Sequence, residues 1–183
     1  MAAGAIYTIG HGNRPSEELQ TLLTEAGVRS LIDVRAHPGS RRYPQFSRAA
    51  LAAELDGAGI GYTWSGADLG GRRHPKAGSR HTAWRNDSFR AYADHMESAA
   101  FVAAIDRLLA QAEQEALAIM CAERLPWQCH RYLISDFLVM RGAAVTHLIG
   151  PGSAREHTLN PMVRIERGVL VYDRGSPLEL GLD

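Results

Sequence analysis

The most informative segment of this chain reads Leu117-Ala-Ile-Met-Cys121-Ala-Glu-Arg-Leu-Pro-Trp-Gln-Cys129-His-Arg131. It starts with an apolar run typical of a buried strand, and the apolar residues that follow Arg131 have helical spacing. Both cysteines of the protein, a carboxylate, a histidine and two arginines therefore lie in one strand-to-helix loop. In an open α/β sheet, such a loop lies at the carboxyl edge of a strand, where ligands bind. The segment predicts an α/β fold with a site at this edge.

Strands and helices alternate on both sides of this loop. Strands are expected at 5–9, 29–34, 60–64, 117–120 and 144–149, with helices at 16–26, 47–57, 98–115 and 131–141. This alternation predicts a three-layer α/β fold, in which a mainly parallel sheet has helices on both faces. The tail predicts a short C-terminal β-hairpin, with strands at 162–166 and 169–172. We therefore expect a single α/β domain over residues 1–150 and a C-terminal extension over 151–183 packed on it.

Length and composition indicate an ordinary globular protein. The chain has 183 residues, of which 45% are hydrophobic and 22% charged. It contains no apolar run of about 18 residues, which a membrane span needs, and its N-terminus lacks the features of a signal peptide. A cytoplasmic protein without a membrane partner is therefore expected. Two cysteines are too few for a disulfide framework, so we expect reduced thiols.

The formal net charge is zero, but the charge is unevenly distributed. Residues 35–90 carry a net charge of +6, and all but one of their basic residues are arginines. Arginine offers a planar pair of donors that matches phosphate or carboxylate. The sequence therefore predicts an anionic small molecule or a nucleic acid as partner, although a solvated surface would also explain many of these arginines.

Polar side chains follow four of the predicted strands at their carboxyl ends. Because the carboxyl ends of parallel strands meet at one edge of a sheet, we expect these side chains to gather there. The candidates for catalysis are His11, Asp33, Cys121, Glu123, Cys129 and His130. The candidates for binding an anion are Asn13, Arg35, Arg41, Arg42, Arg72, Arg73 and Arg131. For Asp33, a purely structural pairing with Arg35 is an equally good interpretation. The other histidines (His74, His81, His95, His147 and His157) have no informative spacing and are interpreted as ordinary.

The two cysteines allow three interpretations. One of them could be a nucleophile, because a thiolate is favoured beside arginine and near a helix N-terminus. Cys121, Cys129 and His130 could instead bind a metal ion, but their C-x7-C-H spacing matches no common zinc pattern. Both cysteines could also be buried and structural. No cofactor is predicted, and the metal ion is kept as an alternative.

Several motifs together resemble a known family. They are Tyr7-Thr-Ile-Gly-His-Gly-Asn-Arg14, Ile32-Asp-Val-Arg35, Ser40-Arg-Arg42, Asp68-Leu-Gly-Gly-Arg-Arg73, Cys121-Ala-Glu123 and Cys129-His-Arg131. In this order they are similar to the motifs of the bacterial and archaeal family called domain of unknown function 488. The resemblance spans about residues 6 to 149 and implies a compact α/β domain with a shared site built from the motif residues. It implies no particular reaction.

The leading hypothesis is an enzyme that acts on a phosphorylated, nucleotide-like or nucleic-acid substrate. In it, Cys121 or Cys129 is the nucleophile, and His11 or His130 transfers a proton. Glu123 or Asp33 orients that histidine, and the arginines hold anionic groups.

The alternative is a non-catalytic module that binds nucleic acid or a nucleotide. The basic segment favours it, as do the three tryptophans in or beside the loops (Trp64, Trp84 and Trp127). The neutral net charge counts against it. A metal-binding protein that uses the two cysteines and His130 is the third hypothesis.

Overall fold

A computed structural model describes residues 5–175 of the chain. One sheet contains β1 (Ile6–Gly10), β2 (Ser30–Asp33), β3 (Gly61–Trp64), β4 (Leu117–Cys121), β5 (Val145–Gly150) and β6 (Ser153–Glu156). Its order is β3-β2-β4-β1-β5-β6. The first five of these strands are parallel, and β6 pairs antiparallel with β5. A separate antiparallel hairpin is formed by β7 (Val163–Glu166) and β8 (Val169–Tyr172). The predicted α/β fold, with a mainly parallel sheet and a C-terminal hairpin, is confirmed.

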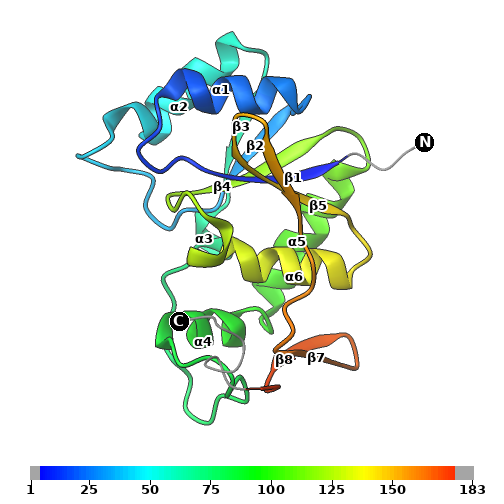
Figure 1. Cartoon of the computed structure of the whole chain (residues 1–183). Coiled ribbons are helices and arrows are strands. Elements are labelled where there is room, and N and C mark those ends of the chain that lie inside the picture. Colours follow the sequence, from blue (N-terminus) through cyan, green and yellow to red (C-terminus); the bar gives the residue numbers. More distant parts are fainter. Residues whose placement is uncertain (1–4, 176–183) are drawn as a thin grey trace.

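The sheet lies between two layers of helices (Figure 1). Helices α1 (Ser16–Glu25) and α2 (Arg48–Gly57) cover one face, and α5 (Ala99–Ala112) and α6 (Arg131–Met140) cover the other. Each face has its own apolar core. Leu19 and Leu51 pack on the first face, whereas Ile105 and Leu133 pack on the second. All five residues of β4 are buried, as expected for a central parallel strand that is covered on both sides.

Two helices of the structure were not predicted from the sequence. The segment 65–86 contains the short helix α3 (Gly66–Leu69), and α4 (Asp87–His95) follows it. Helix α4 begins where the side chain of Asn86 accepts hydrogen bonds from the backbone N–H groups of Ser88 and Phe89. Only Ala91, Tyr92 and Ala93 of this helix are buried, so its sequence lacks a long apolar period.

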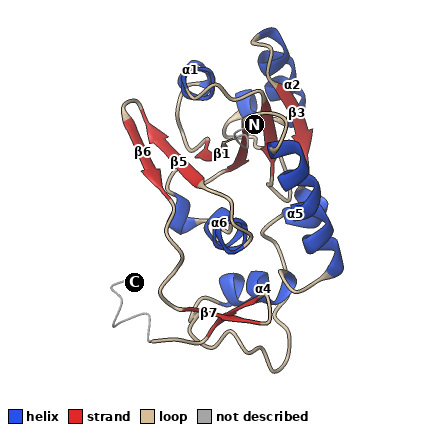
Figure 2. Ribbon diagram, turned by 90° about the vertical axis from the view of Figure 1, so that its right-hand side faces the viewer, coloured by secondary structure: helices blue, strands red, loops and turns tan. Residues whose placement is uncertain are grey.

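The described part of the C-terminal extension, residues 151–175, contacts the core around α6. Gly150 is the last residue of β5, β6 follows in the same sheet, and the chain leaves the sheet only after Glu156. Figure 2 shows α6 between the sheet and the hairpin, with α4 beside the hairpin. Met162 and Tyr172 join the core around α6, and the backbone N–H of Ala83 donates to the carbonyl of Tyr172 over 2.9 Å. Within residues 5–175, no helix is long and apolar enough to cross a membrane.

Candidate functional site

The carboxyl ends of β2, β4 and β1 lie side by side because these strands are neighbours in the sheet. The backbone N–H of His11 donates to the carbonyl of Cys121 over 3.0 Å, and that of Val34 donates to the carbonyl of Met120 over 2.9 Å. The predicted residues that follow these three strands therefore meet at one edge.

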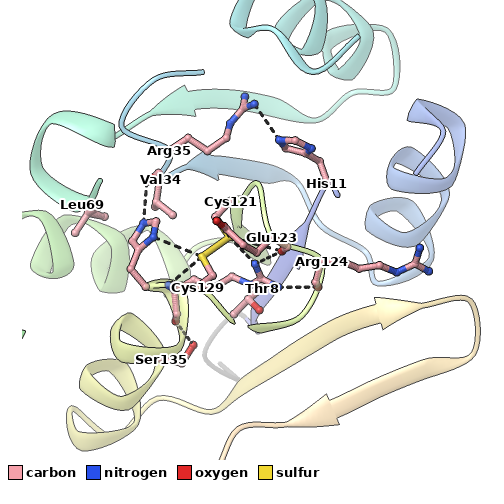
Figure 3. Close-up of a disulfide and its surroundings, with 12 residues drawn as sticks. Thr8, His11, Val34, Arg35, Leu69, Cys121, Glu123, Arg124, Cys129 and Ser135 are labelled. Atoms are coloured by element: carbon pink, nitrogen blue, oxygen red, sulfur yellow. Dashed lines mark hydrogen bonds between the residues drawn. A yellow bond between two sulfur atoms is a disulfide. The ribbon is translucent and has the colours of Figure 1, made fainter. Parts of the chain in front are cut away.

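The loop after β4 folds back on itself. It turns through a short 3-10 helix, Pro126–Gln128, before α6 begins at Arg131. This turn brings the two cysteines together, and their Sγ atoms are bonded to each other (Figure 3). The expectation of two reduced thiols is wrong for this structure. That expectation came from the number of cysteines, which carries no information on how closely a loop brings two of them together.

Two glycines allow neighbouring segments to approach this loop. A Cβ atom on Gly10 would collide with the backbone carbonyl of Glu123, so β1 can pass beside the cysteine loop only with glycine there. A Cβ atom on Gly71 would lie 2.6 Å from Nδ1 of His130. Because Gly71 has no side chain, the backbone after α3 can lie close to the first turn of α6.

Arg131 is the most deeply buried cation at the site, with 1% of its surface exposed. Its Nη1 donates to Sγ of Cys121 over 2.5 Å and to the carbonyl of Glu123 over 2.6 Å, and its Nη2 donates to the carbonyl of Arg124 over 2.9 Å. None of these partners is a carboxylate, and within residues 5–175 its Nε has no hydrogen-bond partner. Burial lowers the pKa of Arg131 to about 9, so the side chain still carries its charge at neutral pH.

His130 faces Cys129. Its Nε2 donates to the carbonyl of Val34 over 3.0 Å, which assigns the unprotonated nitrogen to Nδ1. This Nδ1 lies 3.5 Å from Sγ of Cys129, where it can accept a proton from a thiol. Burial lowers the pKa of His130 to about 4, so the ring is neutral at pH 7.

His11 and Asp33 are engaged with Arg35. The carboxylate of Asp33 accepts from Nε and Nη2 of Arg35 over 2.9 and 2.7 Å, and also from the hydroxyl of Tyr62. Nη1 of Arg35 donates to Nε2 of His11 over 3.2 Å, and Nδ1 of His11 donates to the carbonyl of Gly12 over 2.9 Å. Burial is the main cause that lowers the pKa of His11 to about 4. His11 and Asp33 therefore hold the guanidinium of Arg35 in place. For Asp33, this agrees with the interpretation that it is a structural partner of Arg35.

Two adjoining hollows lie at this edge of the sheet, and the first of them is lined by the two cysteines, which are 1% and 2% exposed. The first has a volume of about 330 Å³ and the second about 450 Å³. Arg35, His37, Ala122 and Glu123 line both. The first is also lined by Arg72, by Asn86 and Ser88 at the start of α4, and by Cys121, Cys129 and His130. The second is also lined by His11, Asn13, Arg42 and Arg124. We call the two hollows together the trough.

The predicted anion-binding arginines are not equivalent. Arg72 and Arg42 line the two ends of the trough. Arg41 is exposed and lines neither of the two hollows. Arg73 donates to the carbonyls of Gly70 and Ala67 over 2.9 and 2.7 Å, so it closes the turn after α3.

The atoms that could hold a metal ion differ from those predicted. Sγ of Cys121, Sγ of Cys129 and a carboxylate oxygen of Glu123 all lie within 4.8 Å of one another. His130 is not part of this group, because its ring nitrogens face the carbonyl of Val34 and Cys129. Glu123 therefore takes the place of His130 in the candidate ligand set.

A second buried polar cluster, the histidine network, lies under the C-terminal extension. Thr8 donates to Nδ1 of His147 over 2.6 Å, and Nε2 of His147 donates to Nδ1 of His157 over 2.9 Å. Nε2 of His157 donates to Asp136 over 2.8 Å, and the hydroxyl of Tyr172 donates to the other carboxylate oxygen of Asp136 over 2.8 Å. Two histidines that were interpreted as ordinary thus belong to one network. The available signal was an aspartate on the apolar face of the last predicted helix.

Comparison with known proteins assigns the chain to a family. No curated protein and no solved structure matches it. The family model called Domain of unknown function DUF488 matches residues 15–138. This range is narrower than the resemblance seen in the sequence and begins after His11, but it contains Asp33, Arg35 and the whole cysteine loop. The chain belongs to the DUF488 family.

Proposed function

We propose that this protein is an enzyme in which the thiolate of Cys121 attacks an anionic substrate, phosphorylated or nucleotide-like, bound in the trough. The observation that carries the proposal is the contact between Sγ of Cys121 and the buried guanidinium of Arg131. The active form is the reduced one, with Cys121 and Cys129 as separate thiols.

The environment of Arg131 favours a thiolate. A buried cation is costly unless an anion compensates its charge. The hydrogen-bond acceptors of the Arg131 guanidinium are two neutral carbonyls and Sγ of Cys121, whereas the Glu123 carboxylate acts on it only through its charge. Of these three atoms, only the sulfur can become an anion. Reduced Cys121 therefore gains stabilisation as a thiolate, which is the nucleophilic form of cysteine.

The lining of the trough favours an anionic substrate. Arg72 supplies a positive charge in the first hollow and Arg42 does so in the second, where Arg124 lies 3.7 Å from Glu18; Glu123 is the carboxylate that lines both. The charge of Arg35 is compensated by Asp33, so Arg35 contributes oriented N–H groups rather than net charge. Asn86 and Ser88 at the start of α4 also line the first hollow, where the Asn86 side chain already accepts the backbone N–H groups of Ser88 and Phe89.

Glu123 is the group placed to move a proton near the reacting sulfur. Its carboxylate is exposed and lies 3.3 Å from Sγ of Cys121. His11, by contrast, uses both ring nitrogens to hold Gly12 and Arg35. We therefore assign proton transfer to Glu123 and the positioning of Arg35 to His11 and Asp33.

The test is the rate of alkylation of each cysteine in the reduced protein by iodoacetamide, measured across pH by mass spectrometry. Cys121 is expected to react with a midpoint below about 8.5, the value of an ordinary thiol. Replacing the guanidinium by an apolar chain of similar length, Arg131→Met, is expected to slow the reaction at pH 7 roughly tenfold, which corresponds to about one pH unit in the midpoint. Arg141→Met is the matched control, because Arg141 is at the far end of α6 and pairs with Asp106.

An ordinary midpoint for Cys121, or an Arg131→Met variant that reacts like wild type while circular dichroism shows it folded, would contradict the proposal. With a reactive Cys121 established, nucleotides and phosphorylated metabolites are screened as compounds that protect it from alkylation.

A metal centre is the second candidate function. The three donor atoms of Cys121, Cys129 and Glu123 would leave one position of a tetrahedral zinc site open to the trough. Elemental analysis of reduced protein purified without a histidine tag tests this function. One equivalent of zinc that blocks alkylation of both cysteines would favour the metal centre over the thiolate enzyme.

A further inference from the structure

We infer that Cys121 and Cys129 are a redox-active pair, through which the protein exchanges electrons with small anionic disulfides. The inference rests on the proposed thiolate of Cys121 and goes beyond it, because it gives Cys129 a chemical role and names a substrate class. It also explains why both cysteines lie in one loop beside the trough.

The surroundings of the two sulfurs suit both redox states. The sulfurs are bonded to each other, so the loop accommodates the oxidised pair. The same sulfurs also contact Arg131 and Nδ1 of His130. A disulfide sulfur carries neither a charge nor a proton, so neither contact serves the oxidised pair. Both contacts serve the reduced pair, in which Arg131 stabilises a thiolate and His130 accepts from a thiol.

The same contacts divide the roles between the cysteines. Cys121 is the attacking residue, because the buried cation lies against its sulfur. Cys129 is the resolving residue, because its neighbour is the unprotonated nitrogen of a neutral histidine.

The proposed exchange has two steps. The thiolate of Cys121 attacks one sulfur of a disulfide RS–SR, so that a Cys121–SR bond forms, the S–S bond breaks, and the electron pair leaves on RS⁻. The thiol of Cys129, which His130 holds through its Nδ1, then loses its proton to the first RS⁻ and attacks Sγ of Cys121. The Cys121–Cys129 bond forms and the second RS⁻ leaves. Two electrons pass from the protein to the substrate, the first RS⁻ carries the proton of Cys129, and solvent protonates the second.

The charges that line the trough favour disulfides that carry carboxylates. Arg72 in the first hollow and Arg42 in the second can hold carboxylates on the two halves of a symmetric disulfide. Oxidised glutathione, which carries carboxylates on both halves, is therefore a suitable probe. The neutral bis(2-hydroxyethyl) disulfide has the same reactive bond without these charges, and serves as the matched comparison.

The experiment mixes reduced protein with oxidised glutathione, quenches with acid at set times, and identifies the products by intact mass and peptide mapping. Wild type is expected to form the Cys121–Cys129 bond and release two glutathione molecules per chain. Cys129→Ser is expected to stop at a mixed disulfide on Cys121, whereas Cys121→Ser should form a mixed disulfide at least tenfold more slowly. The neutral disulfide is expected to react several-fold more slowly than oxidised glutathione with wild type.

Two results would overturn the inference: wild type that keeps a stable mixed disulfide, or Cys129→Ser that acquires none while circular dichroism shows it folded. If a variant does not fold, the wild-type time course by itself still shows whether Cys121 and Cys129 form a bond and release glutathione. Fast alkylation of Cys121 without exchange would refute the exchange activity and leave the proposed enzyme standing. A Cys121 that alkylates as an ordinary thiol would refute the proposed enzyme itself.

Discussion

Two buried polar clusters in this protein differ in how completely their hydrogen bonds are satisfied. In the histidine network, Thr8, His147 and His157 each donate to the next group, Asp136 accepts from both His157 and Tyr172, and all five residues are buried. In the cysteine site, Nε of Arg131 has no partner within residues 5–175, and an open trough lies next to the sulfurs. Buried polar groups need partners, so the closed cluster fixes the fold and the open one has capacity for a ligand.

The histidine network connects three parts of the chain. Thr8 and His147 belong to the sheet, Asp136 belongs to α6, and His157 and Tyr172 belong to the C-terminal extension. Because α6 also begins at Arg131, the network holds in place the helix that carries the buried cation of the site. Damage to the network should therefore act on folding first, whereas damage to the site should act on reactivity first.

The largest effect is expected from Asp136→Ala. This change leaves three buried donors without an acceptor, namely Nε2 of His157, the hydroxyl of Tyr172 and the backbone N–H of Asn160. Each unpaired buried donor costs about 1–3 kcal/mol, so the free energy of unfolding should fall by about 3–5 kcal/mol. Urea denaturation followed by circular dichroism measures it.

Asp106→Ala is the control for this prediction. Asp106 is also an aspartate on a helix, but it is exposed and pairs with Arg141 at the surface. Its loss should change the free energy of unfolding by less than about 1 kcal/mol. Equal effects of the two substitutions would show that the closed network does not fix the fold.

A smaller effect concerns the pH dependence of stability. Burial is the main cause that lowers the pKa of His147 to about 3, and the charges of Arg131 and Arg155 act in the same direction. Between about pH 6.5 and about pH 3, His147 is protonated in the unfolded chain but neutral in the folded chain. Stability from this group is therefore complete above pH 6.5 and is lost as the pH falls.

We expect the free energy of unfolding to fall between pH 7 and pH 5, and His147→Gln to make this fall shallower by up to about 1.4 kcal/mol per pH unit. His11 and His130 at the site contribute to the slope that remains, as do His81 and His95, because burial lowers the pKa values of all four. Urea denaturation at both pH values checks this. An unchanged slope in the variant would mean that His147 is protonated in the folded protein.

The sequence predicts where the site lies, because the position follows from strand order alone. Residues that come after parallel strands share one edge of the sheet, so His11, Arg35 and Cys121 could be placed together without any coordinates. The same argument predicts the sheet and the hairpin, since both depend on apolar periodicity over many residues. Each of these predictions depends on the pattern of a whole strand or helix, so an error of one or two residues at its ends does not change it.

The partner of each polar group could not be predicted, because it depends on side-chain geometry at the scale of one ångström. The sequence left two interpretations of Asp33 open, of which the structure has the pairing with Arg35, and Cys129 turns back onto Cys121 through a short 3-10 helix that the C-x7-C spacing does not specify. The histidine network was missed for the same reason: His147 and His157 are ten residues apart and meet only because β5 and β6 form a turn.

The smallest effect, and the one that best separates the two clusters, is expected from Glu123→Gln. Glu123 is exposed, so the change should leave the free energy of unfolding within about 0.5 kcal/mol of wild type. Its carboxylate lies 3.3 Å from Sγ of Cys121 and opposes Arg131, because a negative charge there disfavours a second one on the sulfur. Alkylation of Cys121 at pH 7 should therefore become a few-fold faster, with a smaller increase in high salt, while Glu17→Gln on α1 changes nothing.

Slower alkylation would instead mean that the carboxylate helps the thiol to lose its proton. The sign of this small change decides whether Glu123 acts on the sulfur through its negative charge or by accepting the proton of the thiol.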